Sequence, residues 1–407
     1  PLKKVALQKL FVNSQVMLIY GAAGTGKTTL INHISNMMNQ SKKLFLTKTY
    51  TALQNLKRLI DNPGLDSDFV SIDSFTKTIT LTDYDIVFVD ECSTIDNRTM
   101  KRLLEKIDES TQLILAGDIY QIESIDFGNW FYYAKDIIKT DYANVELLNT
   151  WRTDKKELKS LWDEVRCIEP IITEKLAIDG PFSSKIGEEI FIPQDEDEIV
   201  LCLNYDGKFG LNNMNLYFQN ANTKSDVYTW TEWTFKVGDP VIFLDTKRSS
   251  LLYNNLKGKI VDISKNDSAI SFTLDIDTIL TERQCRNESF EFVDITDFGT
   301  RIRLEVIANN DETATDEERI KTIIPFQIAY AISIHKAQGL EYKSVKIIIP
   351  PYNAEKISHS IFYTAITRAK EKLKIYWSAE TMKSVVESFS KEKVGQHTLE
   401  LIEKKLE

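Results

Sequence analysis

A glycine-rich segment near the start of the chain has the residue types and spacing that hold phosphate groups. The segment runs from Gly21 to Thr28 as GAAGTGKT, directly after the apolar run VMLIYG and before a helical stretch. Glycines let backbone N–H groups turn toward phosphate oxygens, while the Lys27 ammonium can reach the β- and γ-phosphates and the Thr28 hydroxyl can ligate Mg²⁺. The alternative, a glycine turn with an incidental lysine, does not require a strand and a helix on its two sides. The segment therefore predicts a nucleotide site with these contacts: Gly24, Thr25, Gly26, Lys27, Thr28 and Thr29.

A second apolar run, DIVFVDE, ends in the paired carboxylates Asp90 and Glu91. We expect Asp90 to hold Mg²⁺ together with Thr28, and Glu91 to orient or deprotonate the attacking water. Alone, the pair could also be solvated caps at the end of a strand. Together with the glycine-rich segment it predicts hydrolysis of a nucleoside triphosphate, with ATP and Mg²⁺ as the expected cofactors.

The elements that must position these residues alternate along the chain. From residue 16 to about 149, short apolar runs alternate with helical stretches, which predicts a parallel sheet covered by helices on both faces. We expect this first α/β domain to span residues 1–150. A second α/β domain is expected at 151–224 and 321–407, and strand follows strand in 225–320, which predicts a β-rich, barrel-like insert.

Composition narrows the class of protein. A chain of 407 residues with 43% hydrophobic residues should form two or three domains. It has no apolar run long enough to span a membrane and no leader, so we expect a cytoplasmic protein, although a start at Pro1 is compatible with an excised piece. A net charge of -10 disfavours a protein that coats nucleic acid but allows a local basic groove. The cysteines are too scattered for a zinc site or disulfide framework: Cys92, Cys167, Cys202 and Cys285.

Several further motifs resemble those of the RecD-like branch of superfamily 1 helicases, in the same order. LILAGDIYQIESIDFG resembles the third motif, with Gln121 as the residue that senses the γ-phosphate, and VELLNTWRTD resembles the next, with Arg152 on phosphate. AYAISIHKAQGLEYKSV resembles motif V, which implies nucleotide contacts from Gly339 and Glu341. FYTAITRAKEKL resembles motif VI, which implies that Arg368 is an arginine finger. These resemblances cover nearly the whole chain outside the β-rich insert.

The resemblance implies two RecA-like domains with ATP between them. The first domain would supply the phosphate loop and carboxylates, and the second would supply Arg152, Gly339 and Arg368 on closure. The implied activity is ATP-driven movement on single-stranded DNA, in the 5′ to 3′ direction. Two alternatives stay open: an RNA helicase of the same superfamily, or an ATP-gated clamp for nucleic acid or a partner. A nuclease, another protein or a missing N-terminal domain could be that partner.

The resemblance also implies a set of strand contacts. LTKTYTALQNL resembles motif Ia, with Thr49 on the phosphates, and SIDSFT resembles the motif in which Ser71 touches backbone and Phe75 a base. His335 in motif V and Thr364 in motif VI would face the same groove or the coupling path to ATP. For Phe75 a plain core position is the alternative, because a phenylalanine beside an apolar strand usually packs inside.

The sequence departs from the family pattern in two places. Asp73 stands where many relatives carry a histidine, which places a negative charge close to the expected strand path. The segment from Thr76 to Tyr84 is too short for the β-hairpin pin that RecD-like helicases commonly insert there. We therefore expect movement on single strands with poor duplex separation by the chain alone. Lys247, Arg248, Lys257 and Lys259 in the insert could line a basic groove or serve only solubility.

Overall fold

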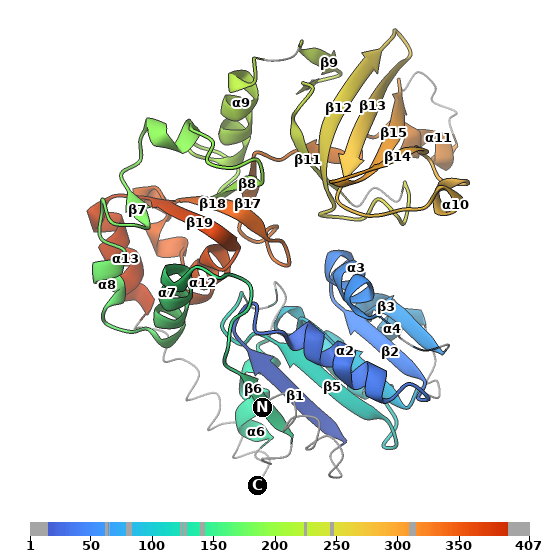
Figure 1. The fold of residues 1–407 in the computed structure, drawn as a ribbon, viewed down its shortest axis with the longest axis vertical. Coiled ribbons are helices and arrows are strands. Elements are labelled where there is room, and N and C mark those ends of the chain that lie inside the picture. The colour runs from blue at the N-terminus through green and yellow to red at the C-terminus, as the bar shows by residue number, and fades with distance from the viewer. Residues whose placement is uncertain are drawn as a thin grey trace. The chain divides into compact units, whose positions relative to one another are not determined.

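The computed structural model describes residues 15–61, 64, 66–78, 84–122, 124, 128–138, 143–223, 226–244, 248–308 and 315–389 (Figure 1). The chain forms two compact units. The first comprises Pro1–Gly187 with Ala337–Glu407, and the second comprises Glu188–Lys336. The phosphate-loop segment and the residues of motif VI therefore belong to the same unit.

The first unit contains a six-stranded sheet in the order β3-β2-β4-β5-β1-β6. All of its strand pairs are parallel. The alternation of apolar runs and helical stretches predicted this arrangement, because parallel neighbours need a crossover connection. The strands are β1 (Val16–Gly21), β2 (Lys43–Thr47), β3 (Ser67–Ser71), β4 (Ile86–Val89), β5 (Gln112–Gly117) and β6 (Asn144–Leu147).

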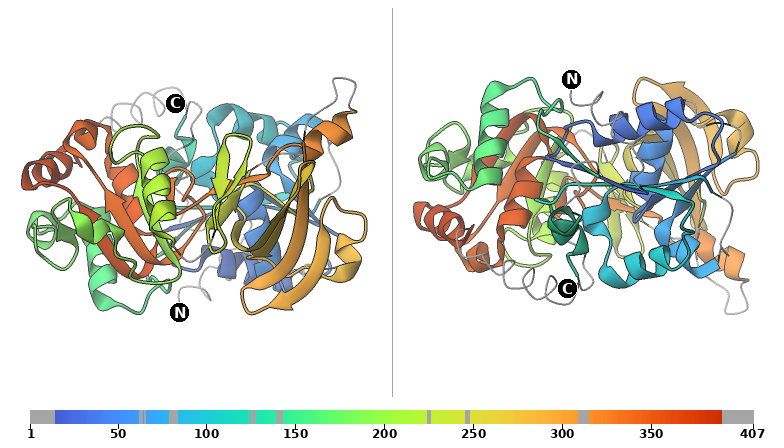
Figure 2. Two further views of the ribbon diagram at one scale, coloured as in Figure 1. Left: turned by 90° about the horizontal axis from the view of Figure 1, so that it is seen from above. Right: turned by 90° about the horizontal axis from the view of Figure 1, so that it is seen from below.

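Helices cover both faces of this sheet, as Figure 2 shows in the view from below. Alternate strand residues enter two separate cores, so Phe88 packs with α2 and α3, while Val87 and Val89 pack with α4, α5 and α6. A strand buried on both faces is apolar at every position, which explains the unbroken IVFV of β4. The covering elements are α2 (Lys27–Met37), α3 (Tyr50–Leu59), α4 (Ile72–Thr78), the short η1 (Cys92–Thr94), α5 (Asn97–Leu104) and α6 (Trp130–Ile137).

The rest of the first unit is a second α/β layer, in which β18 pairs with β19 and β19 with β7, all in parallel. Ile168 follows α7 with a φ of 54°, a left-handed conformation that is costly for a β-branched residue. The elements are α7 (Lys156–Cys167), α8 (Ile172–Lys175), β7 (Ser183–Ser184), β18 (Tyr342–Ile348), η3 (Pro351–Lys356), α12 (His359–Ile366), β19 (Ala369–Tyr376) and α13 (Ala379–Phe389).

The second unit joins a parallel strand pair to an antiparallel sheet. The pair is β8 with β17, and the sheet has the order β14-β15-β13-β12-β11-β16. Aromatic rings fill its core, where Phe235, Phe272 and Phe326 meet edge to face. The elements are η2 (Glu188–Phe191), β8 (Glu198–Cys202), α9 (Leu211–Ala221), β9 (Tyr228–Trp230), β10 (Trp233–Phe235), β11 (Pro240–Phe243), β12 (Lys257–Lys265), β13 (Ala269–Ile276), α10 (Glu282–Cys285), β14 (Glu291–Thr296), β15 (Gly299–Ile307), α11 (Asp316–Lys321), β16 (Phe326–Ile328) and β17 (Ala331–Ser333).

One buried carboxylate organises the start of the antiparallel sheet. Asp239 is fully buried and accepts hydrogen bonds from the Gln219 side chain (2.6 Å), the Lys236 backbone N–H (2.9 Å) and the Tyr330 hydroxyl (2.9 Å). Burial, followed by the charge of Asp239, raises the pKa of Tyr330. Since these donors come from three places in the chain, Asp239 joins α9 to the sheet.

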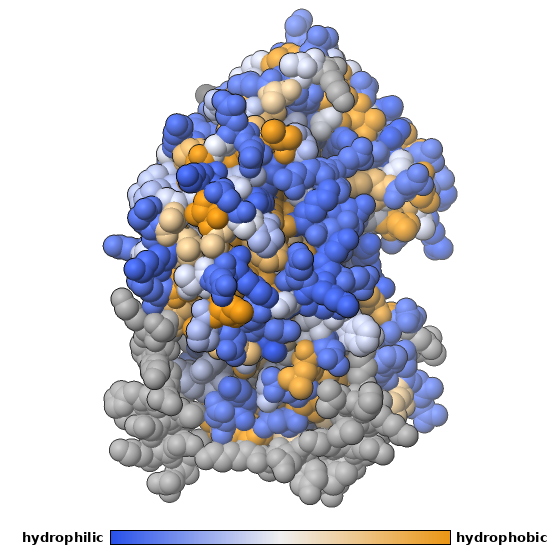
Figure 3. Space-filling model, turned by 60° about the vertical axis from the view of Figure 1, so that its left-hand side comes forward, coloured by the Kyte–Doolittle hydropathy of each residue, from blue (hydrophilic) through white to orange (hydrophobic). Residues whose placement is uncertain are grey.

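Parallel sheets covered by helices, together with a β-rich insert, confirm the predicted fold class. The predicted domain limits at residues 150, 225 and 320 stay a prediction. The two compact units divide the chain at other residues. Among the described residues, no helix is long and apolar enough to cross a membrane. Figure 3 shows one face of the molecule, where hydrophilic residues predominate and apolar patches are small.

Candidate active site

The phosphate loop lies between the end of β1 and the start of α2. Gly24 and Gly26 have φ values of 72° and 85°, which favour glycine at both positions. Gly26 is the N-cap of α2 and offers no side-chain cap, so the helix N-terminus has backbone N–H groups to bind an anion. The Lys27 ammonium donates to the carbonyls of Gly21 (2.9 Å) and Ala22 (3.0 Å), which holds its charge over the loop.

Thr28 and Asp90 meet beside this loop. The Thr28 hydroxyl donates to Oδ2 of Asp90 over 2.8 Å, which joins the first turn of α2 to the end of β4. Burial, and then the neighbouring Glu91, raises the pKa of Asp90 to about 6, against the opposing Thr28 hydrogen bond. A hydroxyl and a carboxylate are the hard oxygen donors that Mg²⁺ takes in triphosphate sites, where phosphates and water supply the remaining ligands. The donor set therefore fits Mg²⁺.

Glu91 follows in an unusual backbone conformation. Its φ of 56° is left-handed, and its N–H donates to Oδ1 of Asp90 over 2.9 Å. Such strain clusters at functional sites, where the surrounding structure holds it. The turn separates the two carboxylates, so that Asp90 is buried beside Thr28 while Glu91 is half-buried.

The end of β5 supplies Gln121 and a residue that the sequence analysis missed. Nε2 of Gln121 donates to Oδ2 of Asp118 over 3.0 Å. Asp118 is fully buried, and burial raises its pKa although Lys27 acts in the opposite direction. Its place directly after the strand, as in the carboxylate pair that follows β4, is the signal that could have identified it.

Arg152 and Glu341 form an ion pair from distant parts of the first unit. Nη2 of Arg152 lies 2.7 Å from Oε1 of Glu341, and Nη1 donates to the carbonyl of Thr367 over 3.0 Å. Lys370 binds the other carboxylate oxygen at 2.8 Å. Burial alone would raise the pKa of Glu341, but Arg152 and then Lys370 outweigh it and lower the pKa to about 2. The carboxylate is therefore ionised and holds Arg152 next to the phosphate loop.

Arg368 is enclosed. Only 1% of the residue is exposed, and its guanidinium donates to the carbonyls of Thr364 (2.9 Å) and Leu340 (3.2 Å). Burial, followed by the nearby charge of Arg152, lowers the pKa of Arg368 to about 10. The structure thus brings both predicted arginines to one place. Gly339 lies in the preceding loop with a φ of 78°, which favours glycine there.

Two hydrogen bonds tie α12 to the nucleotide segments. The backbone N–H of Ala23, inside the phosphate loop, donates to the Tyr363 hydroxyl over 3.1 Å. The backbone N–H of Ile122, next to Gln121, donates to the Thr364 hydroxyl over 2.9 Å. Thr364 is fully buried, which is at odds with its assignment as a direct strand contact, and its other predicted role, a place on the coupling path, stays a prediction.

The residues predicted to contact the strand differ in how exposed they are. Thr49 is exposed and accepts a hydrogen bond from Ala52 N–H (3.2 Å) as the N-cap of α3, and Ser71 is half-buried with its hydroxyl on Ser74. Phe75 is 2% exposed in the core of the sheet, so stacking on a base is corrected to core packing. His335 is exposed in the second unit.

The departure at Asp73 has a compensating partner. The Lys48 ammonium lies 3.1 Å from Oδ1 of Asp73 and 3.3 Å from Oδ2 of Asp96. Asp96 is buried and caps α5 through Thr99, whereas the side chain of Asp73 is 44% exposed. Lys48 therefore offsets the negative charge that the sequence placed near the expected strand path. The short pin segment lies partly outside the described residues, because 79–83 are among those not described.

Trp151 also escaped the sequence analysis. It is 72% exposed, although its backbone N–H donates to the carbonyl of Gly24 in the phosphate loop over 2.7 Å. An exposed indole anchored beside a nucleotide loop has a free face for a base. The signal was the aromatic residue directly before Arg152.

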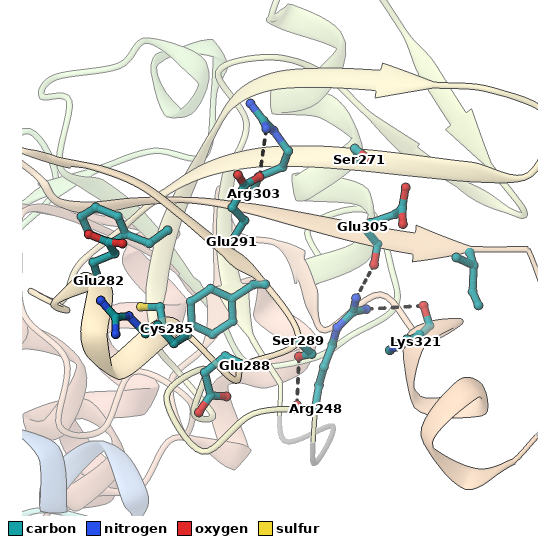
Figure 4. Close-up of a pocket in the computed structure, with 14 residues that line it drawn as sticks. Arg248, Ser271, Glu282, Cys285, Glu288, Ser289, Glu291, Arg303, Glu305 and Lys321 are labelled. Atoms are coloured by element: carbon teal, nitrogen blue, oxygen red, sulfur yellow. Dashed lines mark hydrogen bonds and ion pairs between the residues drawn. The ribbon is translucent and has the colours of Figure 1, made fainter.

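A pocket of about 720 Å³ lies elsewhere, in the β-rich part of the second unit (Figure 4). Arg248 enters it but is only 8% exposed, and donates to the carbonyls of Glu305, Lys321 and Ile323. Basic and acidic side chains are balanced in its lining, which gives no preference for an anion. Arg248 therefore cannot line an open basic groove, Lys257 pairs with Asp197, and Lys247 lies outside the described residues.

Comparisons with known proteins agree with this geometry. The model of the AAA domain family matches residues 3–171, and that of the UvrD-like helicase C-terminal domain matches 328–376. The RecBCD enzyme subunit RecD of Buchnera aphidicola is 22% identical over 442 residues, covering 92% of this chain and 73% of that protein.

Solved structures share the fold. Bacteroides Pif1 bound to single-stranded DNA superposes with a TM-score of 0.55 at 15% identity, over 92% of this chain and 93% of that one. Pif1 helicase from Candida albicans gives a TM-score of 0.54 at 14% identity, over 97% and 98%. These likenesses confirm the two predicted RecA-like domains as a fold. The two family-model matches and the RecD relatives, together with the ordered motifs, support an ATP-hydrolysing helicase of the RecD-like branch of superfamily 1.

Proposed function

We propose that this chain is a single-strand DNA translocase that moves 5′ to 3′ and uses Mg²⁺-ATP as its fuel. The observation that carries the proposal is the contact of Thr28 with Asp90 beside Lys27, in the same unit as the paired arginines Arg152 and Arg368. A phosphate loop and carboxylates on one side, with arginines on the other, can enclose a triphosphate. The solved Pif1 complex with single-stranded DNA supports the choice of track.

In this mechanism the first RecA-like layer binds and orients the fuel. Lys27 and the N-terminus of α2 would bind the phosphates, while Thr28 and Asp90 would hold Mg²⁺, which would neutralise phosphate charge. Glu91 orients the attacking water and accepts its proton. Gln121, held by Asp118, reports the presence of the terminal phosphate to the segment that continues into Ile122.

The arginines complete the site on closure. Arg368 bonds to carbonyls of its own layer, so it must exchange those partners for phosphate oxygens during the cycle. The charge of Arg152 contributes to lowering the pKa of Arg368, and an anion between the two guanidinium groups would offset this repulsion. An arginine acting in this way supplies roughly 10³ to 10⁵ in turnover. Trp151 would stack on the base of the nucleotide.

The strand would be held by polar side chains. Thr49, Ser71 and His335 would contact phosphates, which gives grip without sequence preference. Thr364 would transmit the nucleotide state rather than touch the strand. Without a described wedge, the chain should translocate better than it unwinds, unless a partner protein or the β-rich insert separates the strands.

The decisive experiment measures steady-state ATP hydrolysis without nucleic acid, with single-stranded DNA and with single-stranded RNA. Lys27→Ala serves as the blank. Strong stimulation by DNA supports the proposal, and equal stimulation by RNA would favour an RNA helicase. Lys27-dependent hydrolysis that no strand stimulates would reject the translocase and favour an ATP-gated clamp. A forked-duplex assay beside a translocation assay tests the weak unwinding, which vigorous unwinding by the chain alone would contradict.

A further inference from the structure

We propose that Tyr363 is a positioning residue for ATP hydrolysis, acting through the backbone of the phosphate loop. The proposal rests on the function proposed above and assigns its hydroxyl a specific task. That hydroxyl accepts the Ala23 N–H over 3.1 Å, a contact between residues 340 positions apart in the chain. It is a side-chain tie between α12 and the loop that holds Lys27.

The surroundings of Tyr363 fix its ring. The residue is fully buried, and the ring lies edge-on to Tyr120 with centroids 6.2 Å apart and near that of His359 at 6.4 Å. His359 is itself held, because its Nε2 lies 2.7 Å from the Val165 carbonyl. A ring enclosed in this way has little rotamer freedom, so the hydroxyl stays where the loop N–H can reach it.

The neighbours of Tyr363 on the helix explain why this tie matters for turnover. The next residue, Thr364, receives the Ile122 N–H, and its carbonyl accepts from Nε of Arg368. One short helix therefore contacts the phosphate loop, the segment after the γ-phosphate sensor and the arginine finger. If the tie to the loop is lost, the finger and the loop are no longer held in register. A misplacement of roughly 1 Å at such a site can lower a rate by about 10²-fold.

A purely structural role makes a different prediction. A buried tyrosine that only fills space would be replaced by phenylalanine with no kinetic effect, since the ring is kept. A positioning role requires the oxygen, because Ala23 N–H would lose its acceptor in a buried place. A positioning role therefore predicts a lower kcat with nearly unchanged nucleotide affinity in the phenylalanine variant, whereas a space-filling role predicts no change in kcat.

The test compares Tyr363→Phe with wild type in kcat, KM for ATP and affinity for a fluorescent ATP analogue, with and without single-stranded DNA. We expect kcat to fall by about 10- to 100-fold, with analogue affinity within about twofold of wild type. The matched control is Tyr84→Phe, which removes the hydroxyl of another buried tyrosine that bonds Asp68 (2.6 Å) away from the loop. It should keep wild-type kcat even if it lowers the melting temperature.

A second variant keeps the test informative. Thr364→Val removes the neighbouring hydroxyl. If both hydrogen bonds act through one helix, the kcat of the double variant, Tyr363→Phe with Thr364→Val, should be little lower than that of the worse single variant. Tyr363→Phe with wild-type kcat would overturn the inference while leaving the proposed function intact. Wild type without strand-stimulated hydrolysis would instead overturn the proposed function, whatever Tyr363 does.

Discussion

The nucleotide side and the strand side of this molecule were predicted from the same sequence, yet they differ in how completely the predictions meet in space. On the nucleotide side, Thr28 reaches Asp90, Gln121 reaches Asp118 and Arg152 reaches Glu341 through hydrogen bonds or ion pairs. On the strand side, Phe75 and Thr364 are buried, and only some of the predicted contacts are exposed.

The difference follows from what each site must do. Phosphate chemistry needs a glycine loop, an ammonium, a hydroxyl and carboxylates at fixed places, which leaves a strict spacing in the sequence. A sequence-independent track needs only polar or aromatic groups along a groove, and many arrangements satisfy that need. Motif resemblance therefore locates the strand path by region and does not decide which side chains face it.

Glu91→Gln should give the largest effect and so tests the secure side of the comparison. Removing the general base while keeping its shape should lower kcat by about 10²- to 10⁴-fold, with affinity for an ATP analogue retained. Single-turnover hydrolysis at saturating ATP measures this. Glu105→Gln, which replaces an exposed carboxylate at the C-cap of α5 that pairs with Lys101, is the control and should match wild type. A Glu91→Gln enzyme with near-normal turnover would mean that the nucleotide side has been assigned wrongly.

Trp151→Ala tests whether a residue outside the assigned motifs contacts the nucleotide. Loss of base stacking should raise KM for ATP by about tenfold and leave kcat within a few-fold, because aromatic stacking contributes roughly 1 to 3 kcal/mol. Trp233→Ala removes an indole that is 58% exposed on β10 and should leave both constants unchanged. Equal KM values for wild type and Trp151→Ala would show that the exposed indole does not touch the nucleotide.

Asp73→Asn tests whether the strand passes close to Lys48. Without the Asp73 carboxylate, Lys48 keeps only Asp96 and can attract a phosphate more strongly, so affinity for single-stranded DNA should rise by about two- to fivefold at low salt. Fluorescence anisotropy with a labelled oligonucleotide at two salt concentrations measures the change. Asp136→Asn, which loses a comparable exposed carboxylate beside Lys135, is the control. Unchanged or weaker binding in Asp73→Asn would place the strand away from Lys48.

Glu341→Gln should give the smallest effect, on stability. The folded pKa of Glu341 is about 2, below its ordinary value of 4.5, so the ionised carboxylate stabilises the fold above about pH 4.5. That contribution is lost as the pH falls from 4.5 toward 2. The melting temperature of the variant should therefore lie a few degrees below wild type at pH 7, and this gap should narrow, without closing, at pH 3.5. An equal gap at both pH values would contradict the ion-pair account.

Much of the fold could be predicted from the sequence, for reasons visible in single elements. The IVFV run of β4 is apolar throughout because both faces of its sheet are covered, and the glycine pattern after β1 marks a strand-to-helix turn. Tyr363 could not be assigned, since its role depends on a contact with Ala23, 340 positions away, that leaves no local pattern. Lys48 is similar: its pairing with Asp73 joins residues that lie 25 positions apart.

The close approach at Gly24 has a consequence for which sequences this site can tolerate. A Cβ atom placed on Gly24 would lie 2.3 Å from Cβ of Arg152, and 3.0 Å from the Arg152 backbone nitrogen. Even alanine would therefore push the Arg152 segment away from the loop. In a saturation-mutagenesis screen, Gly24 should behave as an invariant position although it carries no reactive group, whereas the neighbouring Ala23 already has the methyl group that Gly24 cannot accept.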